Sequence, residues 1–116
     1  MQACVPVAPI LGAPTGPRVR EFLYGQEFCV LEIFEGYAFG FTRHDGYCGY
    51  VRADMLQPAR PATHVVNVLR SYQKASPDLK AWEPHMALHF GSRLTRVGVQ
   101  NGWAEVVSDL GRFFMP

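Results

Sequence analysis

An internal repeat divides the chain into two similar halves and restricts each half to a very small fold. A shift of 66 residues aligns six positions of the first half with the second: Phe28 with Leu94, Leu31 with Val97, Ile33 with Val99, Gly36 with Gly102, Tyr37 with Trp103 and Ala38 with Ala104. Further along, a shift of 64 aligns Tyr50 with Phe114 and Val51 with Met115. Self-similarity at a fixed spacing is typical of duplicated structural units. We therefore expect two domains, residues 1–57 and 64–116, joined by a proline-rich linker at residues 58–63.

The local sequence of each half is typical of β-strands. Residues 27–51 are rich in β-branched and aromatic residues, and Gly36 and Asp45-Gly46 interrupt this run, which predicts a three-stranded meander. Asp45-Gly46 predicts a tight primed turn, and Asn101-Gly102 is its counterpart in the second half. Prolines interrupt every stretch that is long enough for a helix. The predicted fold is all-β, with two small, partly open barrels and one 3₁₀ turn near "RADML".

The repeat also predicts which side chains form the two cores. Hydrophobic residues that coincide between the copies are expected to be buried: Phe28, Leu31, Ile33, Leu94, Val97 and Val99. Tyr37 and Trp103 follow equivalent turn glycines, and we expect both rings to be half-buried.

Charge and hydropathy exclude several classes of partner. Eleven Lys and Arg and ten Asp and Glu give a formal net charge of +1, and the basic residues are scattered along the chain. This pattern predicts no nucleic-acid or membrane partner. The opening "MQACVPVAPILGAP" lacks the features of a signal peptide. We expect the chain as written to be cytoplasmic, or to lie in the cell envelope if a leader is missing.

The cysteines and histidines offer two patterns that could carry chemistry. His44 and Cys48 could form a nucleophilic dyad, but the turn residues between them favour the tip of a hairpin. Cys29 lies within a predicted strand, where cysteine packs as a small hydrophobe. His85 and His89 have a spacing found in metal ligands, but no third ligand matches it. We therefore expect no metal and no cofactor.

Three short motifs give the chain a family resemblance. They are Leu23-Tyr24-Gly25-Gln26-Glu27, Asp45-Gly46-Tyr47-Cys48-Gly49-Tyr50-Val51 with Ala53-Asp54 after it, and Ser76-Pro77-Asp78-Leu79-Lys80. With their order and spacing, the chain resembles the tandem bacterial SH3-like domains that precede the catalytic domain of NlpC-type cell-wall cysteine peptidases. The resemblance implies two tandem small SH3-like partly open barrels that help a γ-D-glutamyl-diamino-acid endopeptidase to recognise murein peptides.

The chain departs from this family in one respect that concerns activity. The Asp-Cys-Ser-Gly signature of the catalytic domain does not occur in the sequence. We therefore expect a non-catalytic module. The resemblance implies two partners, a murein peptide or peptidoglycan and a C-terminal peptidase domain in the native context.

The aromatic residues are too numerous for two small cores, so some are expected at the surface. The sequence predicts a shallow groove in the first half, where tyrosine rings pack on a peptide and carboxylates meet an amine. Its predicted residues are Tyr24, Glu27, Asp45, Tyr47, Tyr50 and Asp54.

Two alternative functions remain open from the sequence. One is a protein-interaction module for proline-rich or other peptides, which requires paired aromatic residues on one face and an acidic loop that binds arginine. The other is a self-contained cysteine enzyme, whose activity would have to change on substitution of Cys29 and Cys48 by alanine.

Overall fold

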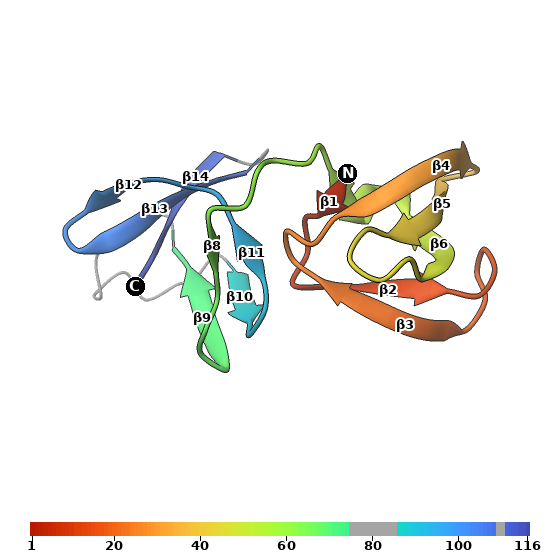
Figure 1. The fold of residues 1–116 in the computed structure, drawn as a ribbon, viewed down its shortest axis with the longest axis horizontal. Helices are drawn as coiled ribbons and strands as arrows, with labels where there is room; N and C mark the ends of the chain where they lie inside the picture. The colour runs from red at the N-terminus through yellow and green to blue at the C-terminus, as the bar shows by residue number, and fades with distance from the viewer. Residues whose placement is uncertain (75–85, 109–110) are drawn as a thin grey trace. The chain divides into compact units, whose positions relative to one another are not determined.

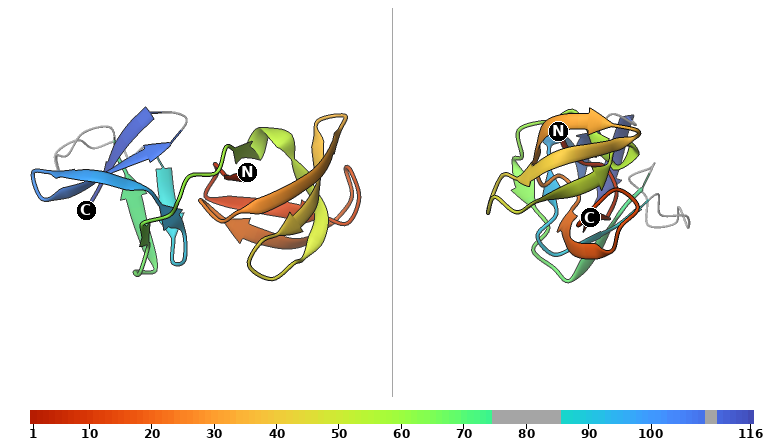
Figure 2. Two further views of the ribbon diagram at one scale, coloured as in Figure 1. Left: turned by 45° about the horizontal axis from the view of Figure 1, so that its top comes forward. Right: turned by 90° about the vertical axis from the view of Figure 1, so that its right-hand side faces the viewer.

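The chain folds into two compact units, Met1–Ala59 and Arg60–Pro116 (Figures 1 and 2). The computed structural model describes residues 1–74, 86–108 and 111–116. Across these residues the protein is all-β, as predicted, and its one helical turn is η1 (Ala53–Met55), which lies at the predicted "RADML". The described residues contain no helix of the length and apolarity needed to span a membrane.

The first unit is built around one five-stranded antiparallel sheet. The sheet has the order β3-β2-β6-β5-β4, and β1 pairs separately with β7 (Figure 1). The meander predicted for residues 27–51 is formed by β4, β5 and β6. The strands are β1 (Gln2–Ala3), β2 (Val7–Leu11), β3 (Arg18–Leu23), β4 (Phe28–Phe34), β5 (Tyr37–Thr42), β6 (Cys48–Arg52) and β7 (Leu56–Gln57).

The described part of the second unit contains a three-stranded sheet and two strand pairs. The sheet has the order β12-β13-β14, while β9 pairs with β10 and β8 pairs with β11. Among the described strands of both units, no sheet closes on itself. The strands are β8 (His64–Val65), β9 (Arg70–Gln73), β10 (Met86–His89), β11 (Arg93–Leu94), β12 (Arg96–Gln100), β13 (Trp103–Ser108) and β14 (Gly111–Met115).

Equivalent two-residue turns connect β4 to β5 and β12 to β13. Asn101 and Gly102 both have positive φ, at 51° and 77°, so the predicted primed turn is confirmed at this position. Glu35 and Gly36 have nearly the same values, 48° and 83°. These two turns lie 66 residues apart in the chain.

The strand registers after these turns also coincide. Ala38 pairs with Val51 between β5 and β6, and Ala104 pairs with Met115 between β13 and β14. Positions related by the shifts of 66 and 64 therefore have equivalent partners in the two sheets.

The β5–β6 turn differs from the predicted two-residue turn at Asp45-Gly46. Thr42 and Tyr47 close the hairpin, because the Thr42 N–H donates to the Tyr47 carbonyl at 3.0 Å. Four residues therefore lie in the loop, and of these Gly46 alone has positive φ. Longer hairpin loops form around an ordinary turn followed by one left-handed residue, so Asp45 does not need the left-handed conformation.

The predicted cores are only partly correct. Phe28 and Leu94 are buried, Tyr37 is half-buried, and Trp103 is more deeply buried than expected, at 8% exposed. The other four predicted core residues are exposed: Leu31, Ile33, Val97 and Val99.

A β-bulge at the same place in both units explains the errors at Leu31 and Val97, and a position on an edge strand explains those at Ile33 and Val99. The register of β4 against β5 shifts between Val30 and Glu32, so Leu31 has no opposite residue, and the second unit shifts in the same way around Val97. A bulge interrupts the regular alternation of side chains. Both bulged strands lie at the edge of their sheets, so Ile33 has a neighbouring strand on one side only.

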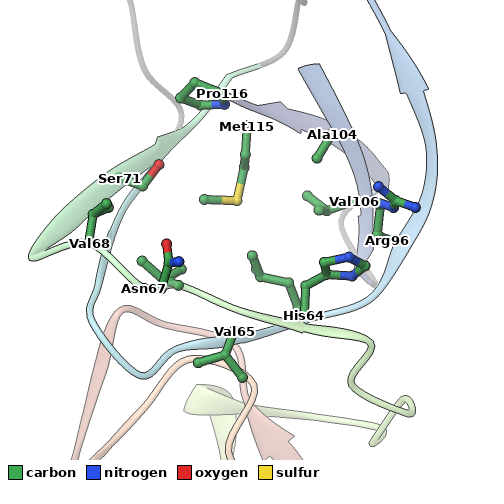
Figure 3. Close-up of a pocket in the computed structure, with 12 residues that line it drawn as sticks. His64, Val65, Asn67, Val68, Ser71, Arg96, Ala104, Val106, Met115 and Pro116 are labelled. Carbon is green, nitrogen blue, oxygen red and sulfur yellow. The ribbon is translucent and has the colours of Figure 1, made fainter. Parts of the chain in front are cut away.

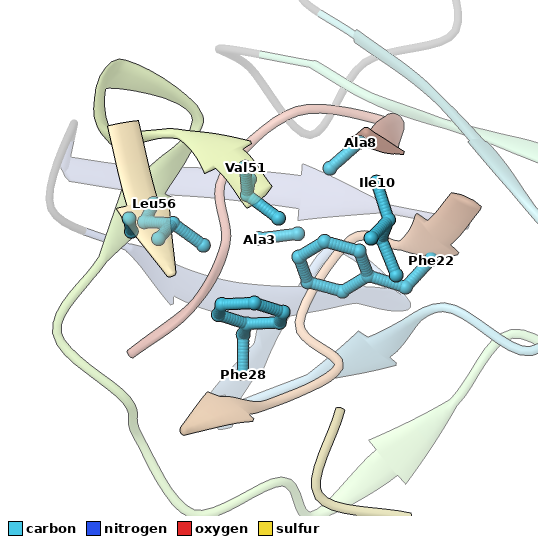
Figure 4. Close-up of a cluster of buried hydrophobic side chains, with 8 residues drawn as sticks. Ala3, Ala8, Ile10, Phe22, Phe28, Val51 and Leu56 are labelled. Atoms are coloured by element: carbon cyan, nitrogen blue, oxygen red, sulfur yellow. The ribbon is translucent and has the colours of Figure 1, made fainter. Parts of the chain in front are cut away.

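The core of the first unit gathers side chains from β1 to β7. Phe22 and Phe28 stack with ring centroids 5.6 Å apart, and Leu56 from β7 points toward Val51 and Ala3 (Figure 4). The complete cluster is Ala3, Ala8, Ile10, Phe22, Phe28, Ala38, Val51 and Leu56.

Two glycines that pair with each other allow this core to close. Gly40 in β5 lies opposite Gly49 in β6. A Cβ atom at Gly40 would lie 2.0 Å from the Cys29 carbonyl oxygen, and one at Gly49 would lie 2.4 Å from Ile10 Cγ2. The backbones of β5 and β6 therefore approach β4 and β2 more closely than any side chain would permit.

Gly49→Ala is expected to destabilise the first unit by roughly 1–3 kcal/mol or more, because overpacked cores must shift backbone and side chains. Thermal or denaturant unfolding measures the change. Gly12→Ala is the matched control, since its Cβ would meet nothing closer than the Val19 Cγ1 at 3.4 Å. Equal stability of the two variants would contradict this account of the core.

Candidate functional site

The outer face of β4, β5 and β6 carries the aromatic residues for which the core has no room. In β5, the small residues Ala38, Gly40 and Thr42 are buried, whereas the alternate positions Tyr37 and Phe39 face outward and are half-buried. Successive side chains of a strand point to opposite faces. The alternation of small and large residues in β5 therefore places the small ones toward the core and the large ones on the outer face.

Cross-strand pairing brings these outward residues together. Glu32 of β4 lies opposite Phe39 of β5, and Phe39 lies opposite Tyr50 of β6. The next row pairs Phe34 with Tyr37. Residues in such rows are close enough for their side chains to interact directly.

These rows form one side of an open pocket of about 440 Å³, here called the aromatic pocket. The Phe39 and Tyr50 rings lie with their centroids 5.0 Å apart and their planes tilted by 49°. The residues that line the pocket are Pro14, Glu32, Phe34, Tyr37, Phe39 and Tyr50.

Among the acidic residues of the first unit, Glu32 and Glu35 have no ion-pair partner within the described part of the chain, and of these two Glu32 lines the aromatic pocket. Arginines pair with four other carboxylates of the first unit: Glu21 with Arg18, Glu27 with Arg43, Asp45 with Arg20, and Asp54 with Arg52. An unpaired carboxylate beside aromatic rings is suited to a group that is both cationic and apolar.

Part of the sequence of this unit matches the model of a known domain family. Residues 10–56 match the bacterial dipeptidyl-peptidase SH3 domain family. The first unit thus contains a bacterial SH3-like domain. All six residues of the aromatic pocket lie within the matched segment of this SH3-like domain. No curated protein matches the chain.

The structure separates the three tyrosines of the predicted groove. Tyr24 is buried, at 4% exposed; its N–H donates to the Pro6 carbonyl at 3.2 Å, and the N–H of the next residue, Gly25, donates to the Ala3 carbonyl of β1 at 3.0 Å. Tyr47 packs against the core cluster, with the Arg20 guanidinium 4.7 Å from its ring centroid. Of the three, Tyr50 alone lines the aromatic pocket.

The carboxylates of the predicted groove are occupied by arginines. Glu27 pairs with Arg43 at 2.8 Å, and Asp54 pairs with Arg52 at 2.7 Å. The hydrogen bond that Arg43 donates to Glu27 raises the pKa of Arg43 above its ordinary value. These acidic groups would have to give up an arginine before they could meet a ligand amine.

Asp45 has a structural role at the β5–β6 turn. Its carboxylate accepts a hydrogen bond from the Thr42 hydroxyl and forms an ion pair with Arg20. The Tyr47 N–H donates to the same Thr42 hydroxyl at 3.0 Å. The Thr42 bond, together with the charges of His44 and Arg20, lowers the pKa of Asp45 below its ordinary value of 3.8, against a smaller opposing effect of burial.

The cysteines and histidines lie in ordinary structural settings. Cys29 is half-buried in β4, as predicted. The Cys48 thiol lies 3.6 Å from the Gly46 carbonyl oxygen, and the His44 ring lies 3.6 Å from Asp45. His89 lies in β10, whereas His85 falls outside the described residues, as do Trp82 and the Ser76–Lys80 motif. Within the described ranges, no three His, Cys, Asp or Glu side chains gather as a metal site requires.

Sequence reasoning missed five of the six residues that line the pocket: Pro14, Glu32, Phe34, Tyr37 and Phe39. The signal that could have found part of it is the alternation "YAFGFT", in which aromatic residues alternate with small ones. This pattern predicts an aromatic outer face over a tightly packed inner one. The partner positions in β4 depend on the bulge, which leaves no comparable signal in the sequence.

Asp45→Asn is expected to lower the melting temperature of the first unit at about pH 7 and to have little effect at about pH 2. The folded-state pKa of Asp45 is lowered, so its ionisation stabilises the fold above the ordinary value of 3.8, and this contribution is lost as the pH falls through the lower, folded-state pKa. Thermal unfolding of both proteins across this pH range measures the difference.

Asp54→Asn serves as the control for this experiment, since the ion pair of Asp54 with Arg52 is largely exposed and exposed pairs contribute little to stability. If Asp45→Asn left the melting temperature unchanged at every pH, the assigned role of Asp45 would be wrong.

Proposed function

We propose that the chain is a non-catalytic recognition module for murein peptides, joined in its native context to a cell-wall cysteine endopeptidase domain. The observation that carries the proposal is the Glu32 carboxylate, which lies in the aromatic pocket without an arginine partner among the described residues. The family that matches residues 10–56 is named for bacterial dipeptidyl-peptidases, which supports an association with a peptidase.

The chemistry of a murein peptide suits the aromatic pocket. An L-Ala-γ-D-Glu-diamino-acid peptide offers amino groups at its N-terminus and on the diamino acid, together with short apolar segments. An amino group would meet Glu32, and the apolar segments would lie on the Phe39 and Tyr50 rings. Aromatic faces attract ammonium groups, and a pocket of about 440 Å³ is within the range of small-ligand sites.

The proposed binding surface keeps one residue of the groove predicted from sequence, Tyr50. The remaining residues of that groove, in particular Glu27 and Asp54, stay predictions that the ligand experiment below can test directly.

The second unit is proposed to be a second SH3-like domain. Its support is the set of equivalent turns and registers: Ala104 pairs with Met115 as Ala38 pairs with Val51, and Asn101-Gly102 repeats the backbone of the β4–β5 turn. A tandem pair of such domains is the arrangement that the family resemblance implies.

A proline-rich peptide is a second candidate ligand, because the tilted pair of Phe39 and Tyr50 lies on one face with an acidic residue beside it. Aromatic grooves of this kind bind extended proline-rich segments, and Glu32 would then meet an arginine of the peptide. The two ligand classes are compared in one experiment.

Titration of ¹⁵N-labelled protein with an L-Ala-γ-D-Glu-diamino-acid peptide is the test of the proposal. Amide shifts are expected to cluster at Glu32, Phe34, Phe39 and Tyr50. Glu32→Gln is expected to weaken binding about two- to fivefold, as for an exposed ion pair, and added salt should have a smaller effect on the variant than on the parent. Tyr50→Ala is expected to weaken binding about fivefold or more.

Glu35→Gln is the matched control, since it makes the same chemical change three residues away and outside the pocket. Asp54→Asn tests the groove predicted from sequence. Loss of binding in the Asp54 variant alone would move the site to that groove. Shifts with a proline-rich peptide but not with the murein peptide would favour the second candidate.

A further inference from the structure

The outer face of the first unit carries a basic residue, Arg52, beside the aromatic pocket. Arg52 of β6 lies directly opposite Tyr37 of β5, which lines the pocket. Along β6, Gly49 and Val51 are buried and Arg52 is exposed, so the arginine side chain points to the outer face. Side chains that lie directly opposite each other on neighbouring strands are close enough to interact. Arg52 therefore stands next to the pocket wall.

Glu32 and Arg52 lie at opposite corners of one patch on this face. The patch has two rows across β4, β5 and β6. The first row is Glu32, Phe39 and Tyr50, and the second is Phe34, Tyr37 and Arg52. With strands about 4.8 Å apart and a rise of about 3.4 Å per residue, the Cα atoms of the two charged corners lie about 12 Å apart. Aromatic rings occupy the rest of the patch, between an acid and a base.

Arg52 keeps hydrogen-bond donors for a ligand although it already has a partner. Its Nη2 donates to Asp54 Oδ2 at 2.7 Å, in a pair whose side chains are 55% and 63% exposed. A guanidinium carries five N–H donors, so it can hold one carboxylate while a second approaches. An exposed pair also contributes little to stability, so sharing Arg52 with a ligand costs the fold little.

The second unit shows that the fold does not require this arrangement. The positions 66 residues after Glu32 and Phe39 are Gly98 and Glu105, and the Glu105 carboxylate is paired with Arg112 at 3.4 Å. A pocket of about 200 Å³ in the second unit has no Phe, Tyr, Trp or carboxylate among its described lining residues (Figure 3). An acid and a base on either side of aromatic rings is therefore a feature of the first unit's own sequence.

We propose that the aromatic pocket selects a zwitterionic ligand, in which Glu32 meets the N-terminal amine of a murein peptide and Arg52 meets the α-carboxylate of its γ-linked glutamate. The role of Arg52 rests on the proposed function and adds the direction in which the peptide lies. Because the bond to the diamino acid uses the γ-carboxyl group, the α-carboxylate stays free for a bidentate pair with a guanidinium. The peptide backbone between the two charges lies on the Tyr37 and Phe39 rings.

The spacing of the corners favours this carboxylate over the more distant one on the diamino acid. The glutamate α-carboxylate lies two residues from the amine, a span of about 7 Å in an extended peptide. A hydrogen bond of about 2.8 Å at each end extends this span to about 13 Å, which matches the separation of Glu32 and Arg52. The diamino-acid carboxylate lies a further residue away and would reach past Arg52.

Two synthetic peptides that differ in one group test the role of Arg52. One is the L-Ala-γ-D-Glu-diamino-acid peptide, and the other has the glutamate α-carboxylate converted to a carboxamide. Titration of the ¹⁵N-labelled chain is expected to give about two- to fivefold weaker binding for the amide, as for the loss of an exposed ion pair. In Arg52→Gln the two peptides are expected to bind equally, because the group that distinguishes them is gone. Changing both partners isolates the energy of the pair.

Arg43→Gln is the matched control, since Arg43 is also an exposed arginine paired with a carboxylate but lies outside the aromatic pocket. This variant should keep the preference of the parent for the carboxylate peptide. Equal binding of the two peptides to the parent, or an unchanged preference in Arg52→Gln, would overturn the role of Arg52 and leave the proposed function standing. If neither peptide bound the parent, the proposed function would fail together with the role of Arg52.

Discussion

The contact between Gly40 and Gly49 is the constraint on which the rest of the first unit depends. With no side chains at this point, the backbones of β5 and β6 lie close to Cys29 and Ile10, and the large aromatic side chains of the core come from β3 and β4. The large side chains of β5 and β6 then have to face outward. The aromatic pocket is thus a consequence of how tightly the core closes, since the same strands supply small residues to one face and rings to the other.

Ion pairing leaves two carboxylates of the first unit without an arginine partner among the described residues, Glu32 and Glu35, and Glu32 is the one that lines the aromatic pocket. Acidic and basic residues are nearly equal in number, so most carboxylates of the first unit can find an arginine nearby. Glu32 is excluded from this pairing within the described chain because its neighbours across the sheet are Phe39 and, beyond it, Tyr50. Glu32 therefore lies beside aromatic rings without an arginine partner among the described residues, whereas Glu27 and Asp54 are already paired with arginines.

Turns and strand alternation were predictable from the sequence, because each depends on residues that are adjacent in the chain. The turn at Asn101-Gly102, the alternation of β5 and the 3₁₀ turn before β7 each depend on a few neighbouring residues. The bulge at Leu31 was not predictable, because it depends on how two strands meet and shifts the register by one residue.

The candidate site was predictable only where it depended on strand alternation. Tyr50 follows from the pattern of β6, in which glycine and valine face the core. The burial of Tyr24 depends on its contact with the start of the chain, and the ion pairs of Glu27 and Asp45 depend on arginines at distant positions. Such pairings across the fold are not visible in local sequence patterns.

The exposed edge of β4 affects whether copies of the protein associate with one another. Leu31, Ile33 and Phe34 are all exposed along a strand that has a neighbour on one side only, and a flat apolar edge of this kind invites pairing with another chain. Two features oppose that pairing: the bulge breaks the regular spacing of backbone groups, and Glu32 places a negative charge within the apolar run. The carboxylate proposed to attract a ligand is therefore also the charge that keeps this edge soluble.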